Sequence, residues 1–211
     1  LDQRQRVYEN TTRIRHGYDI EHNLLWGLRA IDEGWLDLYG NVINENWPSN
    51  DYRLDYVPLR LLVMRQWAAA ARAAHPEDRA LHSPVKERRQ ARWRSDYAFT
   101  RPLLLFNASL EALGAVAAFL LVRMWVRRSE RTLSTPVWRG CIGGAIAAAM
   151  YWFSPASQLS GQAWPSSDVW VPPFFLWAVL FACWNRWFVA GLVIGVGVMF
   201  KGQQMLIAPL F

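Results

Sequence analysis

Three clusters of polar residues in this sequence carry side chains that could take part in chemistry. The first covers residues 18–22 (Tyr-Asp-Ile-Glu-His), the second covers residues 54–59 (Leu-Asp-Tyr-Val-Pro-Leu), and the third joins Gln162, Asp168 and Lys201. A carboxylate held beside a reacting hydroxyl can act as a general base. A lysine within an otherwise apolar segment is costly to bury. The third cluster therefore predicts either a partner for Lys201 or a water-filled cavity around it.

Each cluster also has a purely structural interpretation. Asp19 stands just before an amphipathic pattern, where aspartate is common as the N-cap of a helix. Asp55 precedes Pro58, which can begin a second helix, so Asp55 can be explained as a cap as well. Lys201 lies near the end of its apolar segment, from which a long side chain can reach the membrane surface. Both kinds of interpretation stay open for the three clusters.

The first half of the chain predicts two amphipathic helices. Apolar residues recur there at intervals of three and four, which is the period of a helix with one buried face. This pattern predicts a helix over about 19–38, and a second helix over about 58–74 follows a break rich in Gly and Asn. One apolar face of the second helix is expected to lie on a membrane surface: Leu62, Val63, Trp67 and Ala70.

The second half of the chain predicts about four membrane spans, over 102–126, 137–153, 169–184 and 187–211. The first is long enough to cross a bilayer, since a helix rises about 1.5 Å per residue. The second contains the run GCIGGAIAAA, whose small side chains suit close contact between helices in lipid. The second and third spans are short and are joined by a polar segment over 154–168. We therefore expect them to line a cavity or a water-filled recess.

The composition favours a membrane protein. The chain has 211 residues, of which 53% are hydrophobic, and its mean hydropathy of zero is the average of two unlike halves. Residues 1–101 are polar and charged whereas residues 102–211 are mostly apolar, and a soluble domain would mix the two classes. The 13 Trp residues suit membrane boundaries. We expect an all-α membrane protein with polytopic transmembrane helices and with amphipathic juxtamembrane helices in a large extracytoplasmic loop.

The charges and cysteines argue against a nucleic-acid-binding protein and a metal- or disulfide-stabilised protein, and the charges also indicate the orientation in the membrane. The net charge of +6 comes from arginine clusters that flank apolar segments, which argues against nucleic-acid binding by a basic face. Anionic lipid headgroups or phosphates are the expected partners of these charges. Cys141 and Cys183 form neither a metal-ligand pattern nor a disulfide framework. A cytoplasmic loop between the first two spans, with residues 1–101 outside, is favoured by Arg123, Arg127, Arg128, Arg131 and Arg139. A basic group just ahead of the first span, from Lys86 to Arg101, nearly balances this count, and Arg186 between the third and fourth spans tips it toward the same orientation.

In their order along the chain, these clusters resemble the motifs of type C glycosyltransferases. The runs are Gly-Tyr-Asp-Ile-Glu at 17–21, Leu-Asp-Tyr-Val-Pro-Leu at 54–59, Gln162 with Asp168, and Met-Phe-Lys-Gly-Gln-Gln-Met-Leu-Ile-Ala-Pro-Leu at 199–210. The closest resemblance is to dolichyl-phosphate-glucose-dependent glucosyltransferases and to bacterial polyprenyl-phosphate-sugar transferases. It covers most of the chain, from about Gly17 onward.

The resemblance implies roles for residues of the first half. Asp19 matches the catalytic acidic residue of the first extracytoplasmic loop, and Glu21 matches its acidic neighbour. Asp55 and Pro58 match a D-Y-P-P-L element in which Val57 replaces the first proline. Asp19 is thereby implied as the catalytic group, and the other acidic residues are implied in binding the substrate.

The resemblance also implies a substrate-binding set in the second half. Gln162 matches the Gln of the second loop, and Asp168 matches the Asp of that loop if residues 163–167 are an insertion. Lys201 and Gln203 match a Lys-Gln helix with one residue interposed. The ammonium of Lys201 and the carboxylate of the catalytic aspartate are expected to face one recess at the outer membrane boundary.

The implied reaction moves a sugar from a polyprenyl phosphate in the bilayer to an acceptor hydroxyl that the sequence does not name, with inversion. Asp19 would remove the hydroxyl proton, which contributes about 10²–10⁴ in rate. Lys201 or an arginine of 88–94 would stabilise the leaving phosphate. No cofactor is implied, although Glu21 and His22 could hold a divalent ion. Packing in the core is favoured over contact with the sugar or the isoprenoid for Trp26, Trp164 and Trp170.

Two other interpretations stay open. The chain could be a non-catalytic membrane subunit of a larger complex, or a transporter of a lipid-linked sugar in which Lys201 and Glu111 line the pathway. The composition favours a multi-pass protein of the bacterial inner membrane, with an endoplasmic-reticulum membrane as the alternative. The chain starts without Met and stops within an apolar run, so we expect further spans on either side in a longer protein.

Overall fold

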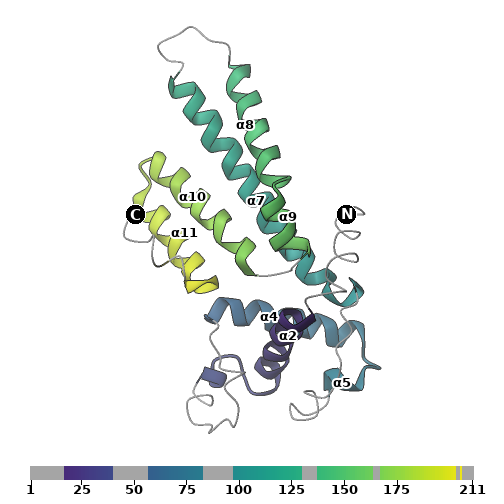
Figure 1. The fold of residues 1–211 in the computed structure, drawn as a ribbon. Helices are drawn as coiled ribbons and strands as arrows, with labels where there is room; N and C mark the ends of the chain where they lie inside the picture. Colours follow the sequence, from purple (N-terminus) through teal and green to yellow (C-terminus); the bar gives the residue numbers. More distant parts are fainter. Residues whose placement is uncertain are drawn as a thin grey trace. The chain divides into compact units, whose positions relative to one another are not determined.

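The computed structural model describes residues 17–39, 57–82, 97–129, 137–163, 167–202 and 205. These residues form helices and the turns between them, and no strand occurs within these ranges (Figure 1). The chain divides into two compact units, Leu1–Leu103 and Leu104–Phe211. The fold over the described ranges is therefore all-α, as the sequence predicted.

The first unit contains two packed helices. α2 covers Gly17–Asp32 and α4 covers Pro58–Ala74, and the single turn α5, Arg79–His82, follows them. α4 begins at a proline because the first residue of a helix has no acceptor for an N–H, so proline loses nothing there. Val57 before it is extended. The bounds of α4 are those that the sequence predicted for the second helix.

The helix predicted over 19–38 begins and ends earlier than expected. Its backbone is helical from Gly17, so Asp19 lies within the first turn and is not the N-cap suggested by the sequence. The helix ends at Asp32, and Gly34 soon after it has a φ of 87°, in the left-handed region that favours glycine. Backbone geometry, rather than apolar spacing, therefore sets the end of this helix.

α2 and α4 approach each other closely at Gly27. A Cβ at this position would lie 2.7 Å from the carbonyl carbon of Met64 and 3.0 Å from the Cβ of Ala68. A glycine is required here because any side chain would push the helices apart. The core of this unit includes Trp26, Ala30, Leu38 and Leu61. Burial of a large apolar side chain contributes about 1.5–3 kcal/mol.

The buried face of α4 differs from the one that was predicted to meet a membrane surface. The buried positions are Leu61, Met64, Trp67, Ala68 and Ala71. Trp67 is therefore part of the core, because it follows Met64 by three residues and precedes Ala71 by four, and such positions share one helical face. Of the other predicted positions, Leu62 and Val63 are half-buried and Ala70 is exposed.

Arg72 joins α2, α4 and α5. Its Nη2 donates to the carboxylate of Asp32 at 2.8 Å, and its Nε donates to the carbonyl of Leu81 at 2.9 Å. Within α2, Arg29 donates two hydrogen bonds to Glu33, at 2.7 and 2.9 Å. The bonds of Arg72 connect the end of α2 to α4 and α5, whereas those of Arg29 stay at the end of α2.

The second unit contains the apolar helices. α7, which crosses the boundary between the units, covers Tyr97–Ser129, and α8 covers Trp138–Trp152. Three short segments follow: α9, Pro155–Gln158; the π-helical turn η3, Leu159–Ala163; and the 3₁₀ turn η4, Ser167–Trp170. The helices α10, Val171–Cys183, and α11, Trp187–Phe200, come next.

One helix in the described part of the chain is long and apolar enough to cross a membrane, over Thr100–Arg128, with a mean hydropathy of 1.9. The apolar segments Ser167–Cys183 and Trp187–Phe200 are shorter. At about 1.5 Å per residue they extend roughly 25 and 21 Å, against about 30 Å for the hydrocarbon core of a bilayer. The last predicted span was to continue to 211, but α11 ends at Phe200 because Lys201 is extended.

α7 and α8 lie side by side in an antiparallel pair (Figure 1). Gly140 and Gly144 of α8 are buried against α7. A Cβ at Gly144 would lie 2.7 Å from the carbonyl oxygen of Phe119, and one at Gly140 would lie 3.3 Å from that of Arg123. The glycine run thus permits the close contact between helices that the sequence predicted.

α10 and α11 form an antiparallel pair joined by residues 184–186. Asn185 has a φ of 57°, its N–H donates to the carbonyl of Ala182 at 2.9 Å, and the N–H of Arg186 donates to that of Phe181 at 2.9 Å. This is the Schellman motif, with asparagine in the left-handed position. Because the pair is antiparallel, the start of α10 and the end of α11 lie at the same end of it.

Candidate functional site

The shared end of α10 and α11 brings two predicted site residues together. Asp168 lies in η4, which leads into α10, and Lys201 follows the last residue of α11. The ammonium of Lys201 forms an ion pair with the carboxylate of Asp168. Each charge also suits its place, since an acid near a helix start and a cation near a helix end complement the helix dipole. The lysine therefore has the partner that its burial required.

The ion pair lies at the boundary between the interior of the unit and water. The side chain of Lys201 is 17% exposed, whereas that of Asp168 is 59% exposed. A pair with such an open partner adds only about 0–1 kcal/mol to stability. The backbone N–H of Lys201 still donates to the carbonyl of Gly197 at 2.9 Å, so the end of α11 is held in place. The arrangement fixes a positive charge at little gain in stability.

Aromatic side chains of α7, η4, α10 and α11 form one cluster, in which Trp170 and Phe200 are close in sequence to the ion pair. Trp170 lies edge-on to Phe106 at a centroid distance of 5.2 Å and to Phe200 at 5.7 Å. Phe174 stacks on Phe200 at 5.2 Å. Trp170 is fully buried. It therefore packs the ends of α10 and α11 against α7, and it is not open to stack on a sugar.

Asn107 of α7 holds the two short segments that precede α10. Its side chain is fully buried, its Nδ2 donates to the carbonyl of Gly161 at 3.0 Å, and its Oδ1 accepts a bond from Trp170 Nε1 at 2.7 Å. One amide thus links α7 to η3 and to η4. The sequence-based prediction missed this residue, although an amide inside an apolar span is itself a sign of contact between helices.

Gln162 lies in η3, which is connected to the ion pair through η4. η3 touches η4, and η4 touches α11, so Gln162, Asp168 and Lys201 belong to consecutive contacting segments. Gln162 is 2% exposed, and its Nε2 has no hydrogen-bond acceptor in the part of the chain that the structure describes. A buried donor without an acceptor costs about 1–3 kcal/mol. A bound hydroxyl or phosphate oxygen would relieve that cost.

Glu111 is the other buried polar group near this segment. It is fully buried, and its carboxylate lies against Gly161, where a Cβ would collide with it. Tyr151 belongs to α8, and its hydroxyl lies against Gly114, which follows Glu111 by about one turn of α7. Because residue 161 is a glycine, η3 can lie directly against the Glu111 carboxylate of α7. This contact lies inside the unit, and a pathway role for Glu111 stays a prediction.

The remaining predicted residues lie outside the described side chains. Asp19 and Glu21 are part of α2 by their backbone, but their side chains are not described, and neither are Asp55 and Gln203. The recess predicted to be shared by Asp19 and Lys201 therefore stays a prediction. Residues 88–94 and Trp164 also lie outside the described ranges, and Trp26 is buried in the core of the first unit.

The described side chains offer no group of three His, Cys, Asp or Glu residues that could hold a metal ion. The side chains of Glu21 and His22, which the sequence suggested for a divalent ion, are not among them. Cys141 and Cys183 are free thiols of intermediate burial.

No protein-family model matches this chain, and comparisons with curated proteins and with solved structures find no similar protein. The resemblance to type C glycosyltransferases accordingly depends on the sequence motifs alone. Function is inferred from those motifs together with the contacts described above.

Proposed function

We propose that this chain is part of a polytopic membrane glycosyltransferase that moves a sugar from a polyprenyl phosphate to an acceptor hydroxyl with inversion. The observation that carries the proposal is the ion pair between Asp168 and Lys201. Both residues belong to the set that the type C motifs imply, and Gln162 lies in the adjoining segment. A pair that adds little stability yet fixes a cation at the edge of an apolar unit suits the binding of an anion.

Lys201 is the proposed stabiliser of the leaving phosphate. Its side chain is 17% exposed, and a fixed positive charge acts more strongly in such a partly buried place than in bulk solvent. A phosphate is already a weak base, so its departure needs stabilisation of charge more than a proton. Asp168 holds the ammonium in place before the substrate arrives. Removing one such preorganised group lowers kcat by about 10²–10³ in other enzymes.

Asp19 is the proposed general base, from its match to the catalytic residue of the motif. It would take the proton of the acceptor hydroxyl as the oxygen attacks the anomeric carbon. The bond to the phosphate breaks on the opposite face, so a single displacement inverts the configuration. Proton transfer of this kind contributes about 10²–10⁴ in rate.

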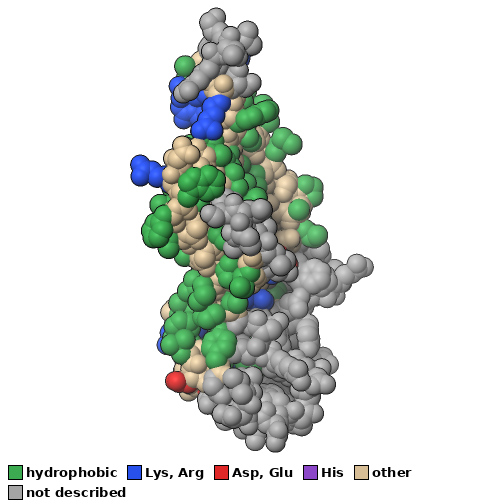
Figure 2. Space-filling view, turned by 90° about the vertical axis from the view of Figure 1, so that its left-hand side faces the viewer, with side chains coloured by type: hydrophobic (Ala, Val, Ile, Leu, Met, Phe, Trp, Pro, Cys, Tyr) green, Lys and Arg blue, Asp and Glu red, His purple; other side chains and the backbone are tan. Residues whose placement is uncertain are grey.

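The proposed location is the inner membrane, with several spans, and an endoplasmic-reticulum membrane is the alternative. Phe188, Leu192 and Val196 are exposed on α11 at intervals of four residues, so they lie on one face of it. Figure 2 shows hydrophobic side chains over much of the visible surface, with Lys and Arg side chains gathered toward its upper end. Such an apolar surface suits lipid or further membrane helices better than water.

Sugar transfer by the full-length protein tests the proposal. Purified protein would be incubated with a panel of labelled polyprenyl-phosphate hexoses and lipid extract as the source of acceptor. We expect transfer by the wild type and a loss of at least about 100-fold for Asp19→Asn. The control Asp37→Asn removes an exposed carboxylate of the same unit and should stay active. Equal rates for the wild type and Asp19→Asn, or no transfer from any donor, would favour a non-catalytic subunit instead.

A further inference from the structure

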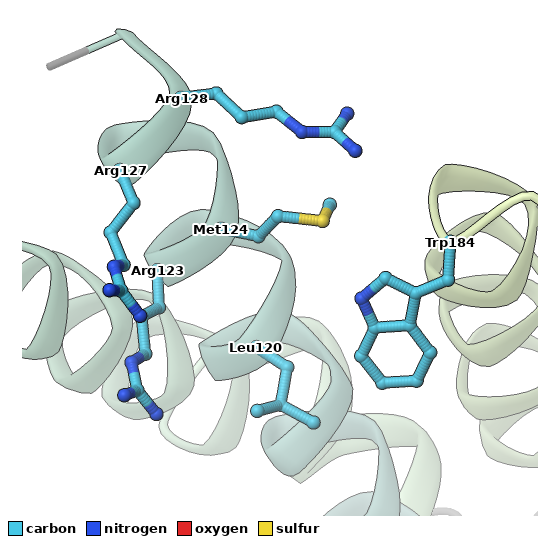
Figure 3. Close-up of a pocket in the computed structure, with 6 residues that line it drawn as sticks. All are labelled: Leu120, Arg123, Met124, Arg127, Arg128 and Trp184. Carbon is cyan, nitrogen blue, oxygen red and sulfur yellow. The ribbon is translucent and has the colours of Figure 1, made fainter. Parts of the chain in front are cut away.

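A pocket of about 560 Å³ lies at the carboxy-terminal end of α7 (Figure 3). Its volume is in the range of small-molecule sites, about 300–1,000 Å³. Three of its lining side chains are cationic and three are apolar: Arg123, Arg127, Arg128, Leu120, Met124 and Trp184. The pocket therefore combines a positive part with an apolar part.

The spacing of these residues on α7 explains how they meet. Positions 120, 124 and 128 follow one another at intervals of four, so they form one stripe of the helix, and positions 123 and 127 form the adjacent stripe. Figure 3 shows Leu120, Met124 and Arg128 extending from α7 on the side that faces Trp184, whereas Arg127 and Arg123 run along α7 on the side away from it. Trp184 closes the pocket from the end of α10.

Contacts with uncharged groups hold the arginines in place. Arg128 donates to the carbonyl of Cys183 at 2.9 Å. A Cβ at Gly140 would lie 3.2 Å from Cγ of Arg127 and 3.6 Å from Cγ of Arg123, so the stems of both side chains pack on α8. No ion pair joins any of the three to a carboxylate within the described ranges. Three neighbouring cations repel one another, and a bound anion would offset that repulsion.

We infer that this pocket binds the phosphodiester headgroup of an anionic phospholipid. The planar guanidinium group matches phosphate oxygens with paired hydrogen bonds. Leu120, Met124 and Trp184 offer an apolar wall for the glycerol and the first carbons of the acyl chains, and tryptophan is typical of the membrane boundary. A soluble phosphate ester would leave this apolar wall unused.

The lipid pocket lies far along α7 from Asn107, which holds the segments that carry Gln162 and Asp168. Arg123 follows Asn107 by 16 residues on the same helix, which places them about 24 Å apart along α7. The inference depends on the proposal that α7 crosses a membrane, but it does not depend on sugar transfer. Lipid binding and transfer are measured in separate assays, so a failure of one is distinguishable from a failure of the other.

Binding of a fluorescent phosphatidylglycerol to the full-length protein in neutral detergent tests the inference. The double variant Arg123→Gln/Arg127→Gln should bind about 30-fold more weakly, since each arginine near an anionic lipid contributes about fivefold. Glutamine keeps the Cγ atoms that pack on Gly140. The matched control is Arg139→Gln, which changes an exposed arginine of α8 that lies over the Trp138 ring at 5.8 Å and should leave binding unchanged.

Competition experiments with the wild type identify the source of the phosphate. Unlabelled phosphatidylglycerol should displace the probe, whereas phosphatidylcholine and inorganic phosphate should not. Equal competition by phosphatidylcholine would overturn the inference, and so would equal binding by the double variant. Competition by inorganic phosphate as efficient as that of phosphatidylglycerol would assign the pocket to a soluble anion and overturn the lipid assignment. These experiments use the unchanged protein, so they decide the matter even where a variant folds poorly.

Discussion

Asn107→Leu should destabilise the second unit by about 2–4 kcal/mol. The Asn107 amide donates to the carbonyl of Gly161 at 3.0 Å and accepts from the indole of Trp170 at 2.7 Å. Leucine has the same branched side-chain shape, with four heavy atoms, but offers no polar atom. The substitution therefore leaves a carbonyl and an indole N–H without the amide, in a place that water does not reach.

The magnitude follows from the burial of both partners. A buried polar group that loses its partner costs about 1–3 kcal/mol. A hydrogen bond between helices in a membrane protein contributes about 0.6 kcal/mol on average and about 1.7 kcal/mol at most. Asn107 and Trp170 are both fully buried, so the two lost bonds should lie at the upper end of these values.

Trp170→Phe isolates one of the two bonds. Phenylalanine keeps an aromatic ring against Phe106 and Phe200 but lacks the N–H, so this change should cost about 1–2 kcal/mol. Because Asn107→Leu removes the same bond, the double variant should cost about 1 kcal/mol less than the sum of the single variants. The control Trp177→Phe removes an exposed bond to the carbonyl of Leu113 and should cost less than about 0.5 kcal/mol.

Equilibrium unfolding in mixed micelles with a rising fraction of dodecyl sulfate, followed by far-UV circular dichroism, measures these free energies. All five proteins would be compared under one set of conditions. If Asn107→Leu unfolds within about 0.5 kcal/mol of the wild type, Asn107 does not hold η3 and η4. Strict additivity of the two substitutions would also refute the bond between Asn107 and Trp170.

Three further substitutions probe the first unit, and Gly191→Ala in the second unit is the control for the first of them. Gly27→Ala should lower stability by about 1–3 kcal/mol because its Cβ would collide with α4, whereas Gly191→Ala, with no atom within 4 Å of the added Cβ, should leave the midpoint of thermal unfolding unchanged or higher. Arg72→Met should lower the free energy of unfolding by about 1–2 kcal/mol, and an unchanged melting curve would contradict its bonds to Asp32 and Leu81. Burial raises the pKa of Tyr39 above 10.0, so the stability from this group is present below pH 10.0 and is lost as the pH rises above it. The Tyr39→Phe variant should lose less of its free energy of unfolding than the wild type as the pH is raised. Identical pH profiles of the two proteins would show that ionisation of Tyr39 does not affect stability.

Features set by neighbouring residues along the chain were predictable from the sequence. Pro58 and the apolar pattern after it define α4, since proline is suited to a helix start and no breaker follows until the end. The glycines of α8 signalled close packing because small side chains let backbones approach in lipid. Lys201 signalled a partner because an isolated charge in an apolar segment is unfavourable, and that partner proved to be Asp168.

Features set by distant residues were not predictable. Trp67 was placed on a membrane surface, since apolar spacing identifies a helical face but not the neighbour that covers it. Asn107 was missed because its partners lie more than fifty residues away and meet it only in the folded unit. The N-cap interpretation of Asp19 was wrong, because the apolar pattern did not show that the backbone is already helical at Gly17.

The kcat of sugar transfer by the full-length protein with Lys201→Met, compared with Lys201→Arg, tests most directly whether the charge held by Asp168 stabilises the departing phosphate. We predict that methionine lowers kcat by about 10²–10³ and that arginine, which keeps the positive charge, retains most of it. A Lys201→Met enzyme as fast as the wild type would contradict the role of this ammonium in the reaction.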